Sequence, residues 1–211
     1  MTVNGEIAVL GTKADAEKDC IAVNGKQMHF TEEKTYLMLN KPRGYVTTLS
    51  DEKGRPTAAE LVKDCGKRVC PVGRLDYWSE GLLLFTDDGD FMQAMLHPRN
   101  EVNKTYHVAV AGEIDRGAAL LGAMRTLDGE PIAPASVEIL HRDGRNALLS
   151  VTIHEGKNRQ IRRMCAAAGL KVSRLIRVAE HGLTLGTLEK GKWRYLTEAE
   201  RRHLPIKKEG E

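Results

Sequence analysis

The most informative stretch of the sequence reads Gly73-Arg74-Leu75-Asp76-Tyr77-Trp78-Ser79-Glu80-Gly81-Leu82-Leu83-Leu84-Phe85. Residues 82–85 form a short apolar run that follows a glycine, which predicts a buried strand. Asp76 lies shortly before that strand, between an arginine and two aromatic residues. Two interpretations of Asp76 are open: the carboxylate caps a turn or a helix, or it carries chemistry at the end of the strand.

Apolar segments on both sides of this stretch predict strands and helices that do not alternate regularly. This order argues against a doubly wound parallel sheet and favours an α+β domain, with a mixed, largely antiparallel central sheet flanked by helices. The predicted strands are 36–39, 82–85, 106–110, 137–140 and 148–153. The predicted helices are 57–62, 91–96, 116–124 and 160–168. Thr197 and Glu200 have the spacing of a capping box that opens a last short helix.

Residues 1–30 have a different pattern, in which short apolar pieces alternate with turn signals. Asn-Gly at 4–5 and again at 24–25 predicts hairpins. So small a segment does not bury a core by itself. We therefore predict a small N-terminal module at 1–30, a polar linker at 31–35, the main domain at 36–205 and a polar tail at 206–211.

The chain has 211 residues, with 32 Lys or Arg against 29 Asp or Glu and a formal net charge of +3. Net charge alone therefore does not identify a nucleic-acid binder. Hydrophobic residues make up 41%, which suits a globular protein and argues against disorder. No apolar run approaches the ~20 residues that span a bilayer, and the N-terminus has no apolar signal region. We expect a cytoplasmic protein with no membrane partner.

The cysteines and histidines do not form a metal-binding motif. Four cysteines, at 20, 65, 70 and 165, contain no Cys-x-x-Cys pair, and the seven histidines contain no His-Glu-x-x-His pattern. A phosphate-binding Gly-x-x-x-x-Gly-Lys loop does not occur either. Metal-dependent and nucleotide-hydrolysing enzymes are therefore disfavoured.

Positive charge is concentrated in residues 157–179, which contain no acidic residue. The seven positive residues of this window are Lys157, Arg159, Arg162, Arg163, Lys171, Arg174 and Arg177. Such a window fits a phosphate backbone, and it equally fits an ordinary solvated face. The window alone does not decide between these two interpretations.

Helical spacing within the window assigns different surroundings to its arginines. One apolar stripe ends at Gly169 and contains Ile161, Met164, Cys165 and Ala168. Arg162 lies at the border of this stripe, where an unpaired guanidinium is costly to bury. We expect Arg162 to pair inside the protein, and Arg159 and Arg163 to meet an external ligand.

Several motifs occur in an order that resembles the RsuA-type family of RNA pseudouridine synthases over nearly the whole chain. They are Leu39-Asn40-Lys41-Pro42-Arg43-Gly44, Gly73-Arg74-Leu75-Asp76, Lys104-Thr105-Tyr106, Gly156-Lys157-Asn158-Arg159-Gln160-Ile161-Arg162-Arg163-Met164 and Leu175-Ile176-Arg177. Residues 1–30 are similar to the latter half of the small alpha-L RNA-binding module of that family, without its helical first half. Asp88 stands where the family usually has Asn.

The resemblance implies the pseudouridine synthase fold, with the active site in a cleft across the sheet, and conversion of a uridine in RNA to pseudouridine without metal or cofactor. Asp76 would be the nucleophile, because a carboxylate is ionised at neutral pH and needs no activating base. Two routes stay open: attack on the sugar or uracil, or removal of a ribose proton to give a glycal. In both routes the uridine must leave its stack.

By the same resemblance, Tyr106 stacks on the flipped base and Arg74 occupies the space it leaves. Arg162 is the expected salt-bridge partner of Asp76, and Arg159 is the competing choice, because a one-turn error in the helix start would exchange their roles. Trp78 either stacks on a base or packs under the loop. The further expected RNA contacts are Lys41, Arg43, Lys104, Lys157, Arg159 and Arg163.

We expect a monomeric enzyme that acts on ribosomal RNA, with large-subunit RNA as the first choice and small-subunit RNA as the alternative. A non-catalytic RNA-binding factor in ribosome assembly is the competing hypothesis from another class. A glycosidase with two carboxylates is a weaker third interpretation. Only Asp76 and Glu80 lie near each other there, and they are too close in sequence to flank a sugar.

Overall fold

The computed structural model describes residues 1–15, 18–28, 34–100 and 102–205. The chain divides into two compact units, Met1–Lys34 and Thr35–Glu211. Of the predicted linker and tail, residues 31–33 and 206–211 lie outside the described residues. Within the described part of the chain, no helix has the length and apolar character needed to cross a membrane.

The N-terminal unit is a small antiparallel sheet with the strand order β2-β1-β3-β4. Its strands are β1 (Thr2–Val3), β2 (Glu6–Ile7), β3 (Ile21–Val23) and β4 (Lys26–Gln27). Both Asn-Gly turns have positive φ at the two central residues, as hairpin turns of this kind require. The predicted hairpins are thus confirmed. Ile21 is buried, whereas Ile7, Val9 and Leu10 are exposed, so this unit buries little apolar surface.

The larger unit is built on a nine-stranded sheet with the main order β11-β12-β8-β13-β7-β5-β15, to which β14 and β6 add at the side. The strands are β5 (Tyr36–Lys41), β6 (Cys70–Val72), β7 (Glu80–Thr86), β8 (Lys104–Ala111), β11 (Ser136–Asp143), β12 (Asn146–Ile153), β13 (Lys171–Glu180), β14 (Leu183–Thr184) and β15 (Trp193–Tyr195). A separate two-stranded hairpin consists of β9 (Thr126–Leu127) and β10 (Glu130–Pro131). All five predicted strands are confirmed.

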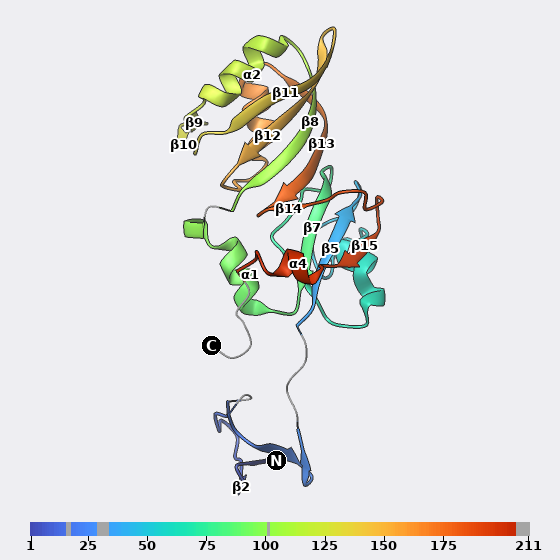
Figure 1. The fold of residues 1–211 in the computed structure, drawn as a ribbon, viewed down its shortest axis with the longest axis vertical. Helices are drawn as coiled ribbons and strands as arrows, with labels where there is room; N and C mark the ends of the chain where they lie inside the picture. The colour runs from blue at the N-terminus through green and yellow to red at the C-terminus, as the bar shows by residue number, and fades with distance from the viewer. Residues whose placement is uncertain (16–17, 29–33, 101, 206–211) are drawn as a thin grey trace. The chain divides into compact units, whose positions relative to one another are not determined.

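One parallel contact joins two antiparallel parts of this sheet. Strand β13 runs parallel to β7, with Ile176 opposite Glu80 and Arg177 opposite Gly81, whereas the other strand pairs of the sheet are antiparallel. Figure 1 shows β8, β11, β12 and β13 on one side of this junction and β7, β5 and β15 on the other. The expected α+β class with a mixed, largely antiparallel sheet is confirmed.

Gly81 allows the two strands to approach at the junction. Its φ is +105°, and a Cβ atom there would lie 2.1 Å from the carbonyl oxygen of Arg177. Both the backbone conformation and the available space therefore require glycine.

Helices cover the sheet. They are η1 (Ala58–Cys65), α1 (Gly89–Leu96), η2 (Pro98–Asn100), α2 (Ile114–Ala123), α3 (Gln160–Ala167) and α4 (Glu198–Arg201). Thr197 and Glu200 form the predicted capping box of α4. Beyond α3, Gly169 has a φ of +75°, and the amides of Gly169 and Leu170 donate to Ala166 and Cys165. This is a Schellman motif, which confirms the predicted end of the helix.

Two predictions need correction. Residues 58–65 form a 3₁₀ helix in place of the α-helix expected at 57–62. Strand β13 was not predicted, because its basic residues were interpreted as part of a charged window. Two irregularities in its pairing with β8 also break the alternation that identifies a strand.

Apolar side chains of β5 and β7 alternate between two buried clusters. Leu37 and Leu39 belong to the larger cluster, which includes residues of α3. Tyr36 and Met38 belong to the smaller one, with residues of α1. Both faces of the sheet are therefore covered at β5 and β7, and the backbone that leads into β7 starts from a rigid support.

Candidate active site

Asp76 lies in a tight turn that leads directly into β7. The amide of Ser79 donates to the carbonyl of Asp76 at 2.9 Å. The hydroxyl of Thr47 donates to the carbonyl of Leu75 at 2.7 Å and accepts from its amide at 3.2 Å. Hydrogen bonds on both sides of Asp76 thus fix its backbone, while its side chain stays partly exposed.

Lys41 holds this turn through hydrogen bonds to backbone carbonyls. Its side chain is fully buried, and its Nζ donates to the carbonyls of Pro42, Asp76 and Ser79 at 3.0, 3.2 and 3.0 Å. Burial lowers the pKa of Lys41 to about 8, against the opposing effect of Asp76 and Glu80. Because all three ammonium donors are used inside the protein, the expected phosphate contact of Lys41 was wrong.

Two arginines of the 157–179 window lie beside Asp76. Nη1 of Arg159 lies 3.8 Å from Oδ2 of Asp76, and Nη2 of Arg162 donates to the carbonyl of Trp78 at 2.9 Å. Arg159, not Arg162, forms the ion pair, as in the competing prediction. The reason is that α3 begins at Gln160, and Arg159 precedes it with a left-handed φ of 48°. Helical spacing therefore does not place the Arg159 side chain.

Arg162 is held close to the turn in a partly buried position. Burial lowers the pKa of this guanidinium and Arg159 lowers it further, whereas Asp76 raises it. Its Nε is buried without a hydrogen-bond partner within the described part of the chain. The expected internal pairing of Arg162 is thus made with a backbone carbonyl, next to Asp76.

Tyr106 lies on β8, buried and opposite Arg177 of β13. Burial raises the pKa of the Tyr106 phenol, and the neighbouring Arg177 opposes this rise. Arg177 is 2% exposed. It donates through Nε to the carbonyl of Leu82 at 2.7 Å, and its Nη2 lies 3.3 Å from Glu180. Sequence reasoning missed this pair, although an acidic residue that ends the basic window was a usable signal.

A cavity of about 450 Å³ opens beside Asp76. It is lined by residues 46–48, 50–53, 55 and 74–77, which include Arg74 and Asp76. Ligand sites commonly have volumes of ~300 to 1,000 Å³. The Arg74 side chain is exposed at this position. Arg74 and Asp76 therefore share one opening, whereas Arg159 and Arg162 lie beside the Asp76 turn and do not line that cavity.

Comparison with known proteins gives a consistent result. The family model for RNA pseudouridylate synthase matches residues 35–167. The chain belongs to this family. A large-subunit pseudouridine synthase B of Bacillus subtilis is 38% identical over 96% of the chain and 84% of its own length. An uncharacterized RNA pseudouridine synthase of Aquifex aeolicus is 41% identical over 94% and 80%.

Solved structures agree with the family assignment. A crystal structure of pseudouridylate synthase matches with a TM-score of 0.72 and 35% identity, covering 96% of this chain and 87% of that one. The archaeal Nop10-Cbf5 complex of the box H/ACA particle matches with a TM-score of 0.51 at 20% identity, covering 69% of this chain and 47% of that chain, which shows the fold alone. The predicted fold and the predicted enzyme class, an isomerase that modifies RNA, are confirmed.

Other residues that the pseudouridine synthase resemblance had singled out already have partners within the protein. Lys104 donates to the carbonyl of Val102 at 3.0 Å, and burial lowers its pKa. Lys157 donates to the carbonyl of Pro131, and Nε of Arg163 donates to Asp128 at 2.8 Å. Arg43 contacts Glu80 at 2.9 Å. RNA binding by these side chains stays a prediction.

Two residues near Asp76 have surroundings that the sequence left open. Trp78 is 59% exposed and makes an edge contact with Tyr77, with ring centroids 4.9 Å apart, so it does not pack under the loop. Asp88 caps α1 through the amide of Phe91 and accepts from the hydroxyl of Tyr36 at 2.6 Å. Its role there is structural.

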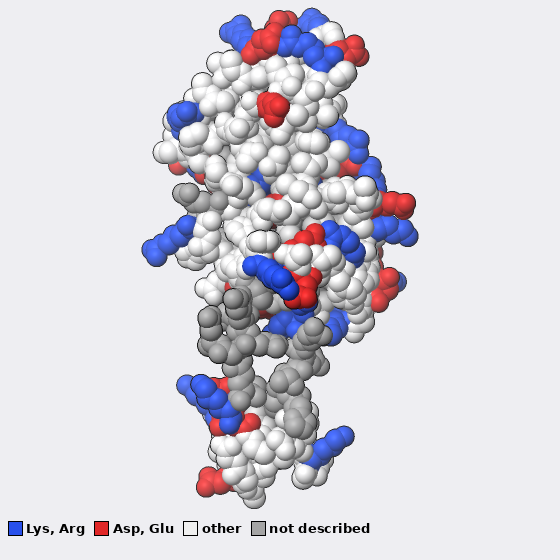
Figure 2. Space-filling model, in the orientation of Figure 1, with Lys and Arg blue, Asp and Glu red and all other residues white. Residues whose placement is uncertain are grey.

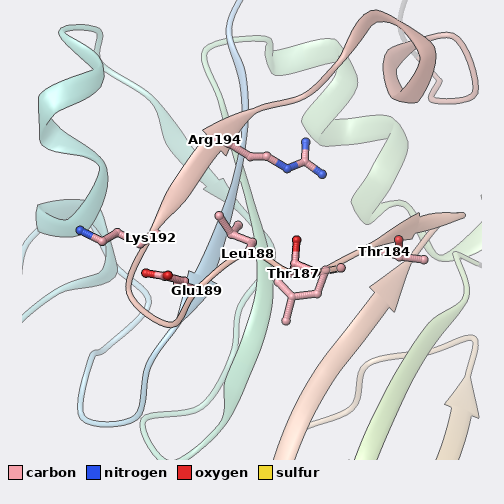
Figure 3. A pocket seen from close by; sticks show the side chains of 8 residues that line it. Thr184, Thr187, Leu188, Glu189, Lys192 and Arg194 are labelled. Carbon is pink, nitrogen blue, oxygen red and sulfur yellow. The ribbon is translucent and has the colours of Figure 1, made fainter.

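A second cavity, of about 510 Å³, is lined by residues 184–189, 192 and 194 (Figure 3). None of the predicted site residues lines it. Among the described residues, no group of three or more His, Cys, Asp or Glu side chains is arranged to hold a metal ion. The choice of site therefore depends on the carboxylate of Asp76 and not on cavity size.

Proposed function

We propose that this pseudouridine synthase isomerises one uridine of large-subunit ribosomal RNA, with Asp76 as the nucleophile and with the uridine flipped out of its stack. The observation that carries the proposal is the position of Asp76, which lines an open cavity on a turn held by hydrogen bonds. The ribosomal target is taken from the large-subunit enzyme of Bacillus subtilis.

The reaction needs a carboxylate, and it needs the uracil of the target uridine to be unstacked from the neighbouring RNA bases. The C1′–N1 bond of the uridine breaks and a C1′–C5 bond forms, while C5 loses a proton and N1 gains one. No electron donor or acceptor is consumed. Asp76 either attacks the sugar or uracil, or removes a ribose proton to give a glycal. Arg159, 3.8 Å away, helps to hold the carboxylate in place in both routes.

The surrounding residues take the remaining roles in this proposal. Tyr106 stacks on the flipped uracil and assists loss of the C5 proton. Arg74, exposed at the rim of the cavity, fills the space in the RNA that the uridine leaves. Arg162 uses its remaining donors to orient Asp76 or the substrate. Base flipping costs a few kcal/mol, which the contacts to RNA must offset.

Release of tritium from RNA labelled at C5 of uridine tests the proposal. We expect the wild-type protein to release tritium from a large-subunit ribosomal RNA transcript, and Asp76→Asn to release none while keeping its affinity for the RNA. Asp143→Asn, which changes an exposed carboxylate of β11, is the matched control and should behave as wild type.

Three outcomes would contradict parts of this function. Release from small-subunit RNA alone would move the target to the alternative substrate. Release by Asp76→Asn at the wild-type rate would remove Asp76 from the chemistry. RNA binding without release on any ribosomal RNA would favour the non-catalytic assembly factor.

A further inference from the structure

Glu80, the first residue of β7, is a buried carboxylate that holds three cations. Its side chain is 2% exposed. Arg174 donates to both of its oxygens, through Nε and Nη2, at 3.0 Å each. Arg43 lies 2.9 Å and Lys190 2.7 Å from the same carboxylate. We call these four residues the Glu80 cluster.

The Glu80 cluster has a local excess of positive charge. Burial raises the pKa of Glu80, but the hydrogen bonds from Arg174 and Lys190 outweigh this effect and lower it to about 2. Glu80 is therefore ionised at neutral pH and supplies one negative charge against three positive ones. By contrast, Arg163 with Asp128 and Arg194 with Glu200 are single pairs.

The three cations keep donors that point away from Glu80. Arg43 is 39%, Arg174 48% and Lys190 52% exposed in their side chains. An arginine has five N–H donors and a lysine three. Arg174 uses two of them on Glu80, and Arg43 uses one there and one on the carbonyl of Ser173 at 2.8 Å. Donors for a second anion therefore remain on each of the three.

The local charge of the Glu80 cluster differs from the average charge of the protein. Figure 2 shows that, on the face drawn, Lys and Arg side chains are interspersed with Asp and Glu side chains. The chain as a whole carries a formal net charge of only +3. An external polyanion therefore gains little from the average surface and much from a place where cations outnumber acids.

The position of the cluster connects it to the candidate active site. Glu80 follows Asp76 by four residues and lies opposite Ile176 at the junction of β7 and β13. Arg43 lies two residues beyond the end of β5. It also lowers the pKa of Arg162, after the larger effects of burial and Arg159, so its charge acts on a side chain next to Asp76. A ligand held by the cluster would thus pass close to the reacting uridine.

We infer that the Glu80 cluster binds a backbone phosphate of the RNA substrate, on a rigid support next to the uridine that reacts. This inference rests on the proposed function and adds Arg174, Lys190 and the buried Glu80 to it. A half-exposed surface leaves a free inorganic ion mostly hydrated, whereas a phosphodiester in a bound RNA adds its contact to many others. Glu80 itself touches no RNA and acts by positioning the three cations.

Salt-dependent binding tests the site on the full chain. The probe is a labelled large-subunit ribosomal RNA transcript, titrated at several KCl concentrations. Arg174→Met and Lys190→Met should each weaken binding about 3- to 10-fold at low salt and reduce the slope of log K against log salt by about 0.7 to 0.9. Lys190→Arg should restore the wild-type slope.

Arg202→Met is the matched control, because Arg202 is an exposed arginine in a single pair with Glu198. It should keep the wild-type slope. Wild-type slopes in both Arg174→Met and Lys190→Met, in a protein that still binds and modifies RNA, would overturn the cluster as a phosphate site and leave the proposed function intact. A wild-type protein that neither binds nor modifies ribosomal RNA would overturn both.

Discussion

Glu80 and Glu180 are both buried acidic residues that are paired with arginine, yet their surroundings differ. Glu80 starts β7 and holds three cations that are 39 to 52% exposed. Glu180 ends β13 and faces Arg177, with side chains that are 5% and 2% exposed. The first arrangement has surplus positive charge at the surface, whereas the second is closed to solvent, with Lys104 opposite Glu180.

This difference separates two uses of the same chemistry. The Arg177–Glu180 pair is too buried to meet a ligand from solvent, but Arg177 also donates to β7 and lies beside Tyr106. It therefore positions strands and the tyrosine. The Glu80 cluster uses its carboxylate to hold cations that still face solvent. Burial of the partners, and not the presence of an ion pair, decides between these two roles.

Arg177→Met should produce the largest effect, because it leaves the Glu180 carboxylate buried and unpaired. Loss of one partner of a buried pair costs about 3 to 5 kcal/mol. Urea unfolding followed by circular dichroism would measure the change in the free energy of unfolding. The double variant Arg177→Met/Glu180→Gln should recover part of it, and a loss below about 1 kcal/mol would contradict a closed pair.

Glu80→Gln should destabilise less, by about 2 to 3 kcal/mol, since its three partners are about half exposed and become hydrated when the carboxylate is lost. The same urea unfolding measures it. Glu198→Gln, which breaks an exposed pair in α4, is the matched control and should stay within about 0.5 kcal/mol of wild type. A larger loss of unfolding free energy in Glu80→Gln than in Arg177→Met would contradict the expected order of the two effects.

The pH dependence of stability should identify the Glu80 carboxylate directly. Its pKa falls from an ordinary 4.5 to about 2 in the folded protein, so the ionised form stabilises the fold. That contribution is complete above pH 4.5 and is lost as the pH falls through about 2. The difference in stability between wild type and Glu80→Gln should shrink over this window, and a constant difference would assign it to packing.

Arg163→Ala should have the smallest effect on stability, below about 1 kcal/mol, because its single pair with Asp128 is exposed. If Arg163 also meets an RNA phosphate, the slope of log K against log salt should still fall by about one unit. An unchanged slope would remove Arg163 from the RNA contacts and leave the Glu80 cluster as the better candidate for a phosphate contact.

The sequence correctly predicted the elements that have regular apolar spacing or a local capping motif. Strand 82–85 and the helix at 160–168 were found because their apolar spacing is regular, and the capping box of α4 because it is local. The missed strand β13 has two pairing irregularities and arginines at both buried and exposed positions. The residue spacing and the charge of this segment therefore indicate different structures. Its strand conformation becomes evident only from its pairing with the neighbouring strands.

The sequence indicated which residues belong to the candidate site, but it did not indicate all of their contacts. Lys41 occurs in a motif with Arg43 and looked like a second phosphate contact, but three carbonyls brought together by folding surround its ammonium. Arg159 pairs with Asp76 because one left-handed residue precedes α3, and a helical projection does not include such a residue. Both differences depend on contacts between distant segments.

Gly81 has a consequence for how this protein tolerates mutation. Each of the nineteen alternatives at that position would place a Cβ 2.1 Å from the carbonyl oxygen of Arg177. Gly156 offers the contrast, since nothing lies within 4 Å of a Cβ built there. Selection for folded protein from a saturation library should therefore return glycine at 81 and many residues at 156, so adaptation to new RNA targets must proceed around the junction of β7 and β13 and not through it.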